Sequence, residues 1–217
     1  MVKMATFKDR DDWLNARGKR IGGSDAASVI GRNHWMSNVQ LWRIKTWREK
    51  QKDISDNPAV KFGTKAEPLL RKLFALDHPG FKVEYKENNM YVNDEMPYAH
   101  YSADGWMTDK QGRFGLLEIK TATISSQAQR DKWQPKAMPS NYYTQLIHGF
   151  MVTGAEFAYL RAYLRYDFDG EFWAHVKEYT IERKDVLEDI EYLRKAEEDF
   201  WRCVVEDREP NLILPTI

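Results

Sequence analysis

The chain has 217 residues, of which 42% are hydrophobic and 30% are charged, and its 33 basic and 33 acidic side chains cancel at pH 7. This length fits one domain with a single sizeable core. The balanced charge excludes binding to nucleic acid through an overall basic excess, so a DNA-binding surface would require local segregation of charge. A single cysteine, Cys203, excludes an internal disulfide framework. No apolar run approaches the roughly 18–20 residues that span a membrane, so we expect a cytoplasmic enzyme or binding protein.

The first third of the chain is predicted to be helical. A short helix is expected over residues 9–17, and Ser24 is placed to cap a second helix over residues 25–30. A third helix should cover residues 41–47, followed by a polar loop over residues 49–58. A fourth is expected from about residue 65 to residue 76, where Thr64 and Glu67 have the spacing of a capping box.

Strands dominate the middle of the chain, and helices return after them. Strands are expected over residues 81–86, 90–92, 100–107, 114–120, 156–164 and 172–180. Helices are expected over residues 125–133 and 140–152, and an amphipathic helix ends the chain at about residues 183–207. This order predicts a single α/β (α+β) domain over residues 1–217, with a core at about residues 13–180. We expect a central mixed β-sheet flanked by helices.

The sharpest local feature is a predicted β-hairpin. A three-residue loop, Lys110-Gln111-Gly112, with glycine at the left-handed position, would pair Asp109 with Arg113. The same register sets Asp104 opposite Glu118, with Cβ atoms about 4.5–5.5 Å apart. Lys120 follows Glu118 by two residues and therefore points to the same face of the sheet.

This hairpin predicts a metal site. Two opposed carboxylates repel each other, and a divalent cation such as Mg²⁺ or Mn²⁺ would relieve that repulsion. Such an ion can bind a phosphate oxygen and lower the pKa of a bound water, while Lys120 can balance charge that develops on the phosphate. The pattern leaves two alternatives open, in which Asp104-Gly105 is a tight turn and Glu118 with Lys120 is a surface ion pair.

An aspartate followed, after a spacer, by Glu-x-Lys on a strand is the signature of the PD-(D/E)xK nuclease superfamily. The segments that accompany it in order are residues 21–25, 63–68, 102–105, 117–121 and 143–146. With them, the chain resembles the YqaJ-like viral recombinase family, related to phage lambda exonuclease, over roughly residues 13–165. The resemblance implies a restriction-endonuclease-like nuclease core.

The resemblance also implies an activity and partners. It points to a Mg²⁺-dependent 5′-to-3′ exonuclease that digests one strand of linear double-stranded DNA and leaves 3′ single-stranded tails for recombination. Two Mg²⁺ ions are expected, with Mn²⁺ as a substitute, together with a homotrimeric ring and a single-strand annealing protein as partner. The setting would be the cytoplasm of a bacterial host, with the gene carried by a phage or prophage. An endonuclease of the same superfamily and a catalytically inactive DNA-binding module are the alternatives.

The resemblance assigns roles to individual residues. Asp104 and Glu118 resemble the metal-binding acids, with the backbone carbonyl of Ile119 as a further ligand, and Lys120 resembles the catalytic lysine. Glu67 resembles a helical acid that assists the metal centre, and Gln145 resembles a helical amide that lines the site. From the residues alone, Glu67 could instead complete the capping box, and Gln145 could be a partly exposed amide.

Arg17 resembles the arginine that holds a 5′ phosphate, and Ser24 lies at the start of the neighbouring helix. We expect the two to form a 5′-phosphate pocket separate from the metal, with Lys19 or Arg20 as alternatives to Arg17. Residues 157–165 alternate aromatic and arginine side chains on one face of a strand. That face could follow DNA or be an ordinary solvated or interface surface.

Overall fold

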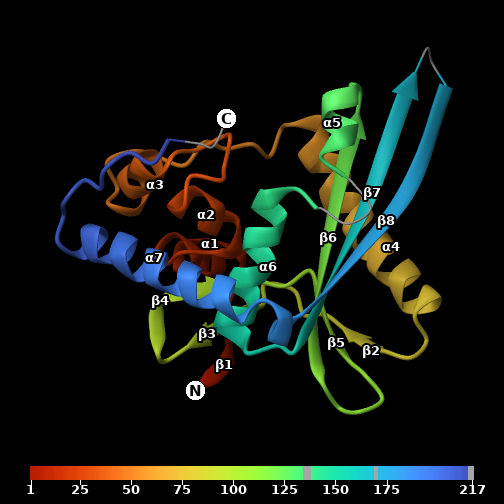
Figure 1. Cartoon of the computed structure of the whole chain (residues 1–217), viewed down its shortest axis with the longest axis horizontal. Helices are drawn as coiled ribbons and strands as arrows, with labels where there is room; N and C mark the ends of the chain where they lie inside the picture. The colour runs from red at the N-terminus through yellow and green to blue at the C-terminus, as the bar shows by residue number, and fades with distance from the viewer. Residues whose placement is uncertain (134–137, 169–170, 215–217) are drawn as a thin grey trace.

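Two β-sheets and seven α-helices make up the computed structural model, which describes residues 1–133, 138–168 and 171–214 (Figure 1). The helices are α1 (Arg10–Gly18), α2 (Gly23–Val29), α3 (Asn38–Lys45), α4 (Pro58–Asp77), α5 (Gln127–Asp131), α6 (Ser140–Thr153) and α7 (Leu187–Val205), with a 3-10 turn η1 (Arg183–Asp185) before α7. The strands are β1 (Val2–Ala5), β2 (Lys82–Glu84), β3 (Met90–Asn93), β4 (Met96–Tyr101), β5 (Gly105–Thr108), β6 (Phe114–Ile124), β7 (Phe157–Phe168) and β8 (Glu171–Glu182).

The larger sheet has five strands in the order β2-β5-β6-β7-β8. Its central pair, β6 and β7, is parallel, while the other neighbours are antiparallel. The strands β1, β3 and β4 form a separate three-stranded sheet. The structure therefore confirms the predicted α/β architecture with a central mixed sheet, and Figure 1 shows helices on both sides of that sheet.

Strand β7 separates the two hydrophobic layers, because successive side chains point to opposite faces. Ala158, Leu160, Ala162 and Leu164 are fully buried in the core that α6 and α7 share. On the other face, Phe157 packs with Leu70 and Phe74 of α4. Arg161 is only 2% exposed there and forms ion pairs with Asp77 and Glu178. The expectation of a solvated or DNA-following face is thus wrong at Arg161, because α4 covers this part of the sheet.

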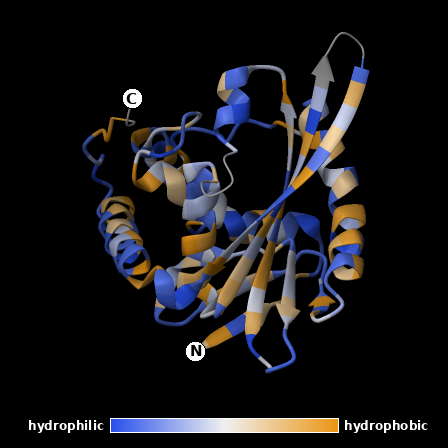
Figure 2. Cartoon of the chain, turned by 45° about the vertical axis from the view of Figure 1, so that its right-hand side comes forward, coloured by the Kyte–Doolittle hydropathy of each residue, from blue (hydrophilic) through white to orange (hydrophobic). Residues whose placement is uncertain are grey.

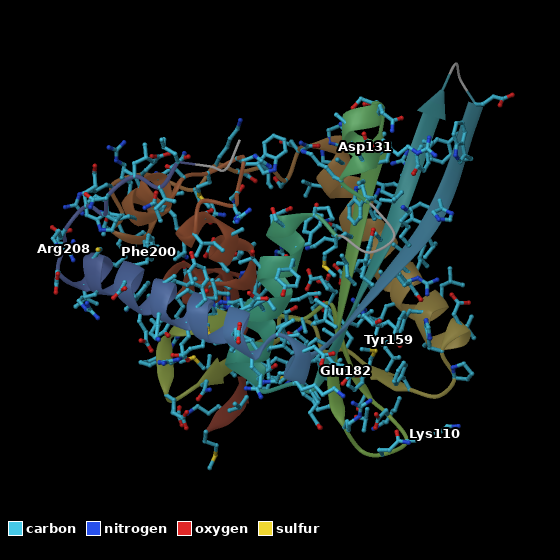
Figure 3. The ribbon with its side chains drawn as sticks, viewed as in Figure 1. Lys110, Asp131, Tyr159, Glu182, Phe200 and Arg208 are labelled. Carbon is cyan, nitrogen blue, oxygen red and sulfur yellow. The ribbon has the colours of Figure 1, made fainter. Side chains whose placement is uncertain are left out.

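The predicted hairpin register is confirmed. Gly105 pairs with Leu117 and Thr108 with Phe114, and the Asp109 N–H donates to the Arg113 carbonyl. Gly112 has a φ of +81°, a backbone conformation that residues other than glycine rarely adopt. Lys110, labelled in Figure 3, lies at the tip of this turn. Local turn chemistry alone was therefore enough to set the alignment of β5 and β6.

The single strand expected over residues 100–107 is wrong. The chain divides there into β4, which belongs to the three-stranded sheet, and β5, which belongs to the five-stranded sheet. The side chain of Asn89 explains the division, since its Oδ1 accepts the Ala103 N–H and its Nδ2 donates to the Ala103 carbonyl, both at 2.8 Å. A side-chain amide thus takes the place of a strand partner and lets the chain change sheets.

Two predicted helix starts are also wrong. Helix α2 begins at Gly23 after the N-cap residue Gly22, whose N–H donates to the carboxylate of Asp25, so Ser24 lies in the first turn and is not the cap. Helix α4 begins at Pro58 with Asn57 as its cap. The capping box at Glu67 is therefore absent, because Thr64 is already inside α4.

The predicted C-terminal amphipathic helix is confirmed as α7. Its buried residues are Ile190, Leu193, Glu197, Phe200 and Cys203, and Figure 2 shows hydrophobic and hydrophilic residues alternating around it. Cys203 is buried with a free thiol, as expected for a packing residue. None of the helices in the described residues combines the length and the apolar character that crossing a membrane requires.

Candidate active site

Glu118 lies at the centre of a polar cluster on β6, and its side chain is only 1% exposed. Its Oε1 accepts hydrogen bonds from Lys120 Nζ at 2.6 Å and from Gln145 Nε2 at 2.5 Å. Its Oε2 accepts a hydrogen bond from the Tyr101 hydroxyl at 2.7 Å. Three donors from β4, β6 and α6 therefore hold the carboxylate in one orientation, which identifies it as an internal acid and excludes a surface ion pair.

Asp104 lies immediately before β5, beside Glu118. Its Oδ2 accepts the backbone N–H of Ile119 at 2.8 Å, so the carboxylate is fixed across the hairpin and does not cap a turn of its own. Burial raises the pKa of Asp104 well above its usual value, and the negative charge of Glu118 raises it further. The two acids therefore converge as the register predicted, and the site carries negative charge that Lys120 does not fully compensate.

Lys120 lies beside the same two carboxylates. Burial alone would lower the pKa of Lys120, but the nearby Glu118 and Asp104 reverse that effect and raise it above its ordinary value. The ammonium group also lies 5.1 Å from the centroid of the Tyr142 ring. Lys120 is thus a cation held in position beside the two carboxylates.

Glu67 approaches the acids from α4. It is held by Arg71, one helical turn further along, and Arg71 also donates to the backbone carbonyl of Asp104. The Arg71 guanidinium stacks over the Tyr85 ring at 3.5 Å. Burial raises the pKa of Glu67, and Glu118 adds to that effect while Arg71 opposes it. A third carboxylate thus lies within electrostatic reach of the first two.

Two glycines allow α2 to approach this cluster closely. A Cβ atom on Gly22 would lie 2.7 Å from Cε1 of His100, and one on Gly23 would lie 3.0 Å from Cγ of Gln145. Any larger residue would have to displace the buried His100 ring or shift the half-buried Gln145 side chain. The Gly22-Gly23 pair thereby brings the first turn of α2, including Ser24, to the edge of the site.

All seven side chains predicted for the site line one cavity of about 600 Å³, namely Arg17, Ser24, Glu67, Asp104, Glu118, Lys120 and Gln145. A second hollow of about 350 Å³ shares Glu67, Asp104 and Lys120 with the first. It lies between the first half of α4 and the middle of β6, where Ile119 also lines it. Glu67 and Asp104 therefore border both hollows, whereas Glu118 borders the larger one alone.

Arg17 does not form a separate pocket, which corrects the prediction. Its guanidinium lies 4.3 Å from the centroid of the Trp13 ring in the same cavity as the acids. Burial lowers its pKa, and Asp25 and Asp104 oppose that effect. Of the two alternatives, Lys19 is exposed and Arg20 donates to the Pro97 carbonyl. Neither is among the described residues that line the cavity.

The donor set fits a hydrated divalent cation. Among the described residues, no three His, Cys, Asp or Glu side chains form a ready cage for a metal ion. Mg²⁺ does not need one, since it keeps several waters and usually binds through one or two carboxylates together with substrate phosphates. Asp104 and Glu118 supply the hard oxygen donors. Burial first, and then the charge of Glu118, raises the pKa of Asp104, and a bound cation would offset the repulsion between the two carboxylates.

Sequence reasoning missed two residues of this site. Arg71 could have been found, because a basic residue four positions after Glu67 on a helix is a recognised ion-pair spacing. Tyr101 carried no such signal, because it was assigned to the same strand as Asp104, whereas the structure places it on a different sheet. Its hydroxyl reaches Glu118 only because the chain divides at Ala103.

A family model and a curated relative match this chain. The model of the YqaJ-like viral recombinase domain matches residues 12–156. The chain is 33% identical over 192 residues to the uncharacterized protein YqaJ of Bacillus subtilis (strain 168), which covers 88% of this chain and 55% of that protein. The chain thus spans about half the length of that relative.

Solved structures share the fold. An alkaline exonuclease from Laribacter hongkongensis superposes with a TM-score of 0.64 at 18% identity, covering 91% of this chain and 94% of the other. A phage related exonuclease from Haemophilus somnus gives a TM-score of 0.54 at 12% identity, with coverages of 89% and 98%. The matches of the family model and of the Bacillus relative together show that the chain belongs to the YqaJ-like viral recombinase family.

Proposed function

We propose that the protein is a Mg²⁺-dependent 5′-to-3′ exonuclease that digests one strand of linear double-stranded DNA and leaves 3′ single-stranded tails for recombination. The observation that carries the proposal is the convergence of Asp104, Glu118 and Lys120 in one cavity, with a second hollow that also borders Asp104 and Lys120. Membership of a recombinase family and the fold shared with two exonucleases support a nuclease.

Each residue has a defined task in this proposal. Asp104, Glu118 and the Ile119 carbonyl would hold Mg²⁺, which supplies Lewis acidity and lowers the pKa of a bound water. Tyr101 and Gln145 keep the Glu118 carboxylate oriented, as outer partners of metal ligands generally do. Lys120 stabilises negative charge that develops on the phosphate during hydrolysis. Glu67 would assist a second Mg²⁺, and Mn²⁺ should replace either ion.

Arg17 and Ser24 are proposed to recognise the 5′ phosphate. A terminal phosphate carries an extra negative charge and an extra acceptor oxygen compared with an internal one, and a guanidinium can contact two of its oxygens at once. Both side chains line the cavity that contains the acids. A bound end would therefore lie next to the first scissile bond, as a 5′-to-3′ direction requires.

A homotrimeric ring and a single-strand annealing protein are the proposed partners, in the cytoplasm of a bacterial host that carries the gene on a phage or prophage. One surface supports contact with further copies. Leu69, Leu73 and Leu76 are 66%, 41% and 77% exposed and lie on one side of α4, the helix with orange segments at the right of Figure 2. Leucines spaced in this way form a stripe that another subunit could cover.

The test is incubation with Mg²⁺ of linear and covalently closed duplex DNA, the linear form carrying either a 5′ phosphate or a 5′ hydroxyl. We expect degradation of the linear form alone, faster with the phosphate, and 3′ single-stranded tails among the products. Cleavage of the closed circle would instead identify an endonuclease. Binding of all forms without any cleavage would identify a DNA-binding module.

A further inference from the structure

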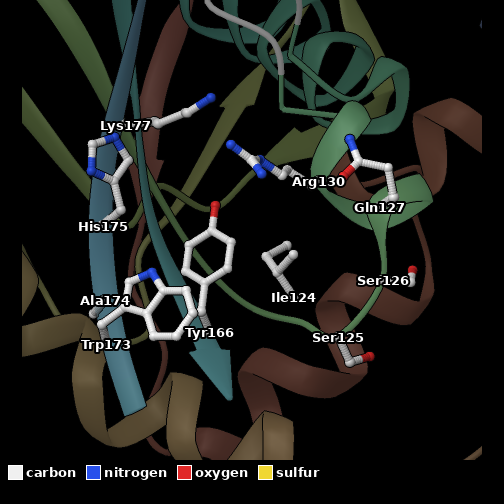
Figure 4. A pocket seen from close by; sticks show the side chains of 10 residues that line it. All are labelled: Ile124, Ser125, Ser126, Gln127, Arg130, Tyr166, Trp173, Ala174, His175 and Lys177. Carbon is white, nitrogen blue, oxygen red and sulfur yellow. The ribbon is translucent and has the colours of Figure 1, made fainter. Parts of the chain in front are cut away.

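A cavity of about 730 Å³ lies away from the acids, between α5 and the far part of the β7–β8 hairpin (Figure 4). Ten described residues line it, and none of them is acidic. Arg130 and Lys177 carry positive charge, and His175 adds a ring that can donate a hydrogen bond. In a chain whose charges balance overall, this pocket is a local concentration of positive charge.

The wall of this pocket also presents an aromatic surface. The rings of Tyr166 and Trp173 are nearly parallel, at 4°, with centroids 5.4 Å apart. The Trp173 side chain is 48% exposed although it is large and apolar. Figure 4 shows the two rings side by side, with the Tyr166 hydroxyl directed toward the side where Arg130 lies. Aromatic faces beside cations are the arrangement on which proteins stack unpaired bases.

The strand register places the pocket on the same face of the sheet as the acids. Ile124 pairs with Tyr166, and Tyr166 pairs with Trp173. Ile124 follows Lys120 by four residues on β6, so its side chain points to the same face. Four residues of a strand span roughly 13 Å, which places the pocket that far beyond Lys120.

Two aromatic side chains separate the pocket from the acids. Tyr142 contacts Lys120 and packs against Trp133, with ring centroids 5.6 Å apart. Lys177, on the pocket wall, donates in turn to the Trp133 carbonyl. The pocket is therefore a second site on the same face and not an extension of the catalytic cavity.

We propose that this pocket binds single-stranded DNA, with a base stacked on the Tyr166 and Trp173 pair and phosphates held by Arg130, His175 and Lys177. A duplex hides its base faces inside the stack, so exposed rings in a pocket favour an unpaired strand. The proposal rests on the proposed function, because a nuclease that digests one strand of a duplex creates an unpaired strand beside its active site.

The test measures binding of a short fluorescein-labelled oligothymidylate by fluorescence anisotropy, with EDTA present so that no cleavage occurs. The full chain is compared with Trp173→Ala and with Phe172→Ala. Phe172 is the matched control, because it is similarly exposed, at 53%, and precedes Trp173 on β8 but points to the opposite face. We expect Trp173→Ala to weaken binding by about tenfold, since stacking of one base has an effect of that size, and Phe172→Ala to bind like the wild type.

Salt dependence tests the cations separately. Arg130→Ala should reduce the slope of log affinity against log salt by about 0.7, the value for one phosphate contact on a single strand. The inference is wrong if the wild type does not bind the oligothymidylate, if Trp173→Ala binds it as well as the wild type does, or if Phe172→Ala loses as much affinity. Equal loss of affinity for a blunt duplex would also overturn it.

Failure of the proposed nuclease would look different. If the wild type does not degrade linear duplex DNA but its affinity for oligothymidylate depends on Trp173, the nuclease proposal is wrong and the pocket remains. If the wild type degrades DNA while Trp173→Ala leaves binding unchanged, the pocket proposal is wrong and the nuclease remains.

Discussion

Helix α6 makes hydrogen bonds with two different buried carboxylates. Gln145 donates to Glu118 on one side of the helix, and His148, three residues later, contacts Glu197 of α7 at 2.7 Å. The two acids are almost equally buried, at 1% and 0% exposure. Their surroundings differ: Glu118 borders a cavity with Asp104 and Glu67, whereas His148 and Glu197 are enclosed in the core.

The buried pair of His148 and Glu197 carries no net charge. His148 Nε2 faces the backbone carbonyl of His100 at 2.8 Å, and a carbonyl can only accept, so Nε2 carries a hydrogen. A proton must also lie between His148 Nδ1 and Glu197 Oε1, since two lone pairs would repel each other at 2.7 Å. The pair is therefore neutral overall and enclosed, while the cavity beside Glu118 is lined by four carboxylates and four cations, namely Glu67, Glu87, Asp104, Glu118, Arg10, Arg17, Arg71 and Lys120. Contact of the charged groups with a cavity, and not burial of an acid, distinguishes the proposed catalytic region from a structural one.

The largest effect on activity is expected at the site that borders the cavity. Asp104→Ala should abolish Mg²⁺-dependent DNA cleavage, because it removes a proposed metal ligand, while the thermal unfolding temperature stays close to that of the wild type. Asp94→Ala is the control, since Asp94 is an exposed acid between β3 and β4 of the other sheet. Full activity of the Asp104 variant would show that the converging acids are not the catalytic centre.

Substitution in the His148–Glu197 pair should instead lower the free energy of unfolding. Glu197→Ala leaves His148 buried without its partner, and breaking one half of a buried pair costs about 3–5 kcal/mol of the free energy of unfolding. Urea unfolding measures this loss. Glu198→Ala, next to it on α7, should cost less than about 1 kcal/mol because its ion pair with Arg194 is surface-accessible. Replacing both members by leucine should cost much less than Glu197→Ala does; an equal loss would contradict the account of a paired charge.

Lys120 is expected to affect the rate of cleavage more than binding. Lys120→Ala should slow single-turnover cleavage by about 10²–10³-fold, the usual effect of removing one group that stabilises developing charge. Affinity for DNA ends, measured in EDTA, should change little. Lys110→Ala, on the exposed turn of the same hairpin, serves as the control. Loss of binding with an unchanged cleavage rate would contradict the assigned role.

A smaller effect is expected for end recognition. Arg17→Ala should reduce the preference for 5′-phosphorylated over 5′-hydroxyl ends by roughly tenfold or more, since a hydrogen bond to a charged group contributes about 1.5–3 kcal/mol. Because Arg17 shares its cavity with Asp104, removal of its positive charge should also lower the Mg²⁺ concentration needed for activity. Arg20→Ala is the control. An unchanged end preference for the Arg17 variant would remove Arg17 from the proposed phosphate site.

The smallest effect concerns pH. Burial would lower the pKa of His148, but Glu197 and the His100 carbonyl raise it above its usual value of about 6.5, and burial raises the pKa of Glu197. Stabilisation by a raised histidine pKa is complete below about pH 6.5 and is lost as the pH rises through the folded-state value, and the raised glutamate pKa acts in the same direction. The charged or titratable groups that influence the pair from neighbouring elements are Asp25, His100 and Tyr98.

The wild type should therefore lose its stability advantage over the double leucine variant as the pH rises from acid to alkaline. Urea unfolding of both proteins across that range measures the difference. A difference that stays constant would show that the pair does not exchange its proton in this range.

The sequence predicted those parts of the molecule that neighbouring residues determine. The β5–β6 register followed from Asp109 and Gly112 in one turn, and the convergence of Asp104 with Glu118 followed from that register. The start of α4 is also signalled, since Asn57 followed by Pro58 is a typical cap and first residue, although the polar composition of residues 49–58 predicts a loop there.

Contacts between distant segments could not be predicted in this way. The division of the expected strand at residues 100–107 depends on Asn89, whose amide is fourteen positions from Ala103. Helix α4 covers Arg161, and its Asp77, which pairs with Arg161, is 84 positions away in the sequence. The His148–Glu197 pair also joins distant segments. Nothing in the spacing of the two residues indicates that α6 and α7 pack side by side.

The two hollows that share Glu67, Asp104 and Lys120 have a consequence for how these groups can be reached. A side chain that borders a single cavity is blocked by whatever fills that cavity. These three side chains border two hollows, so a molecule that occupies one of them leaves the other free for a water or an ion.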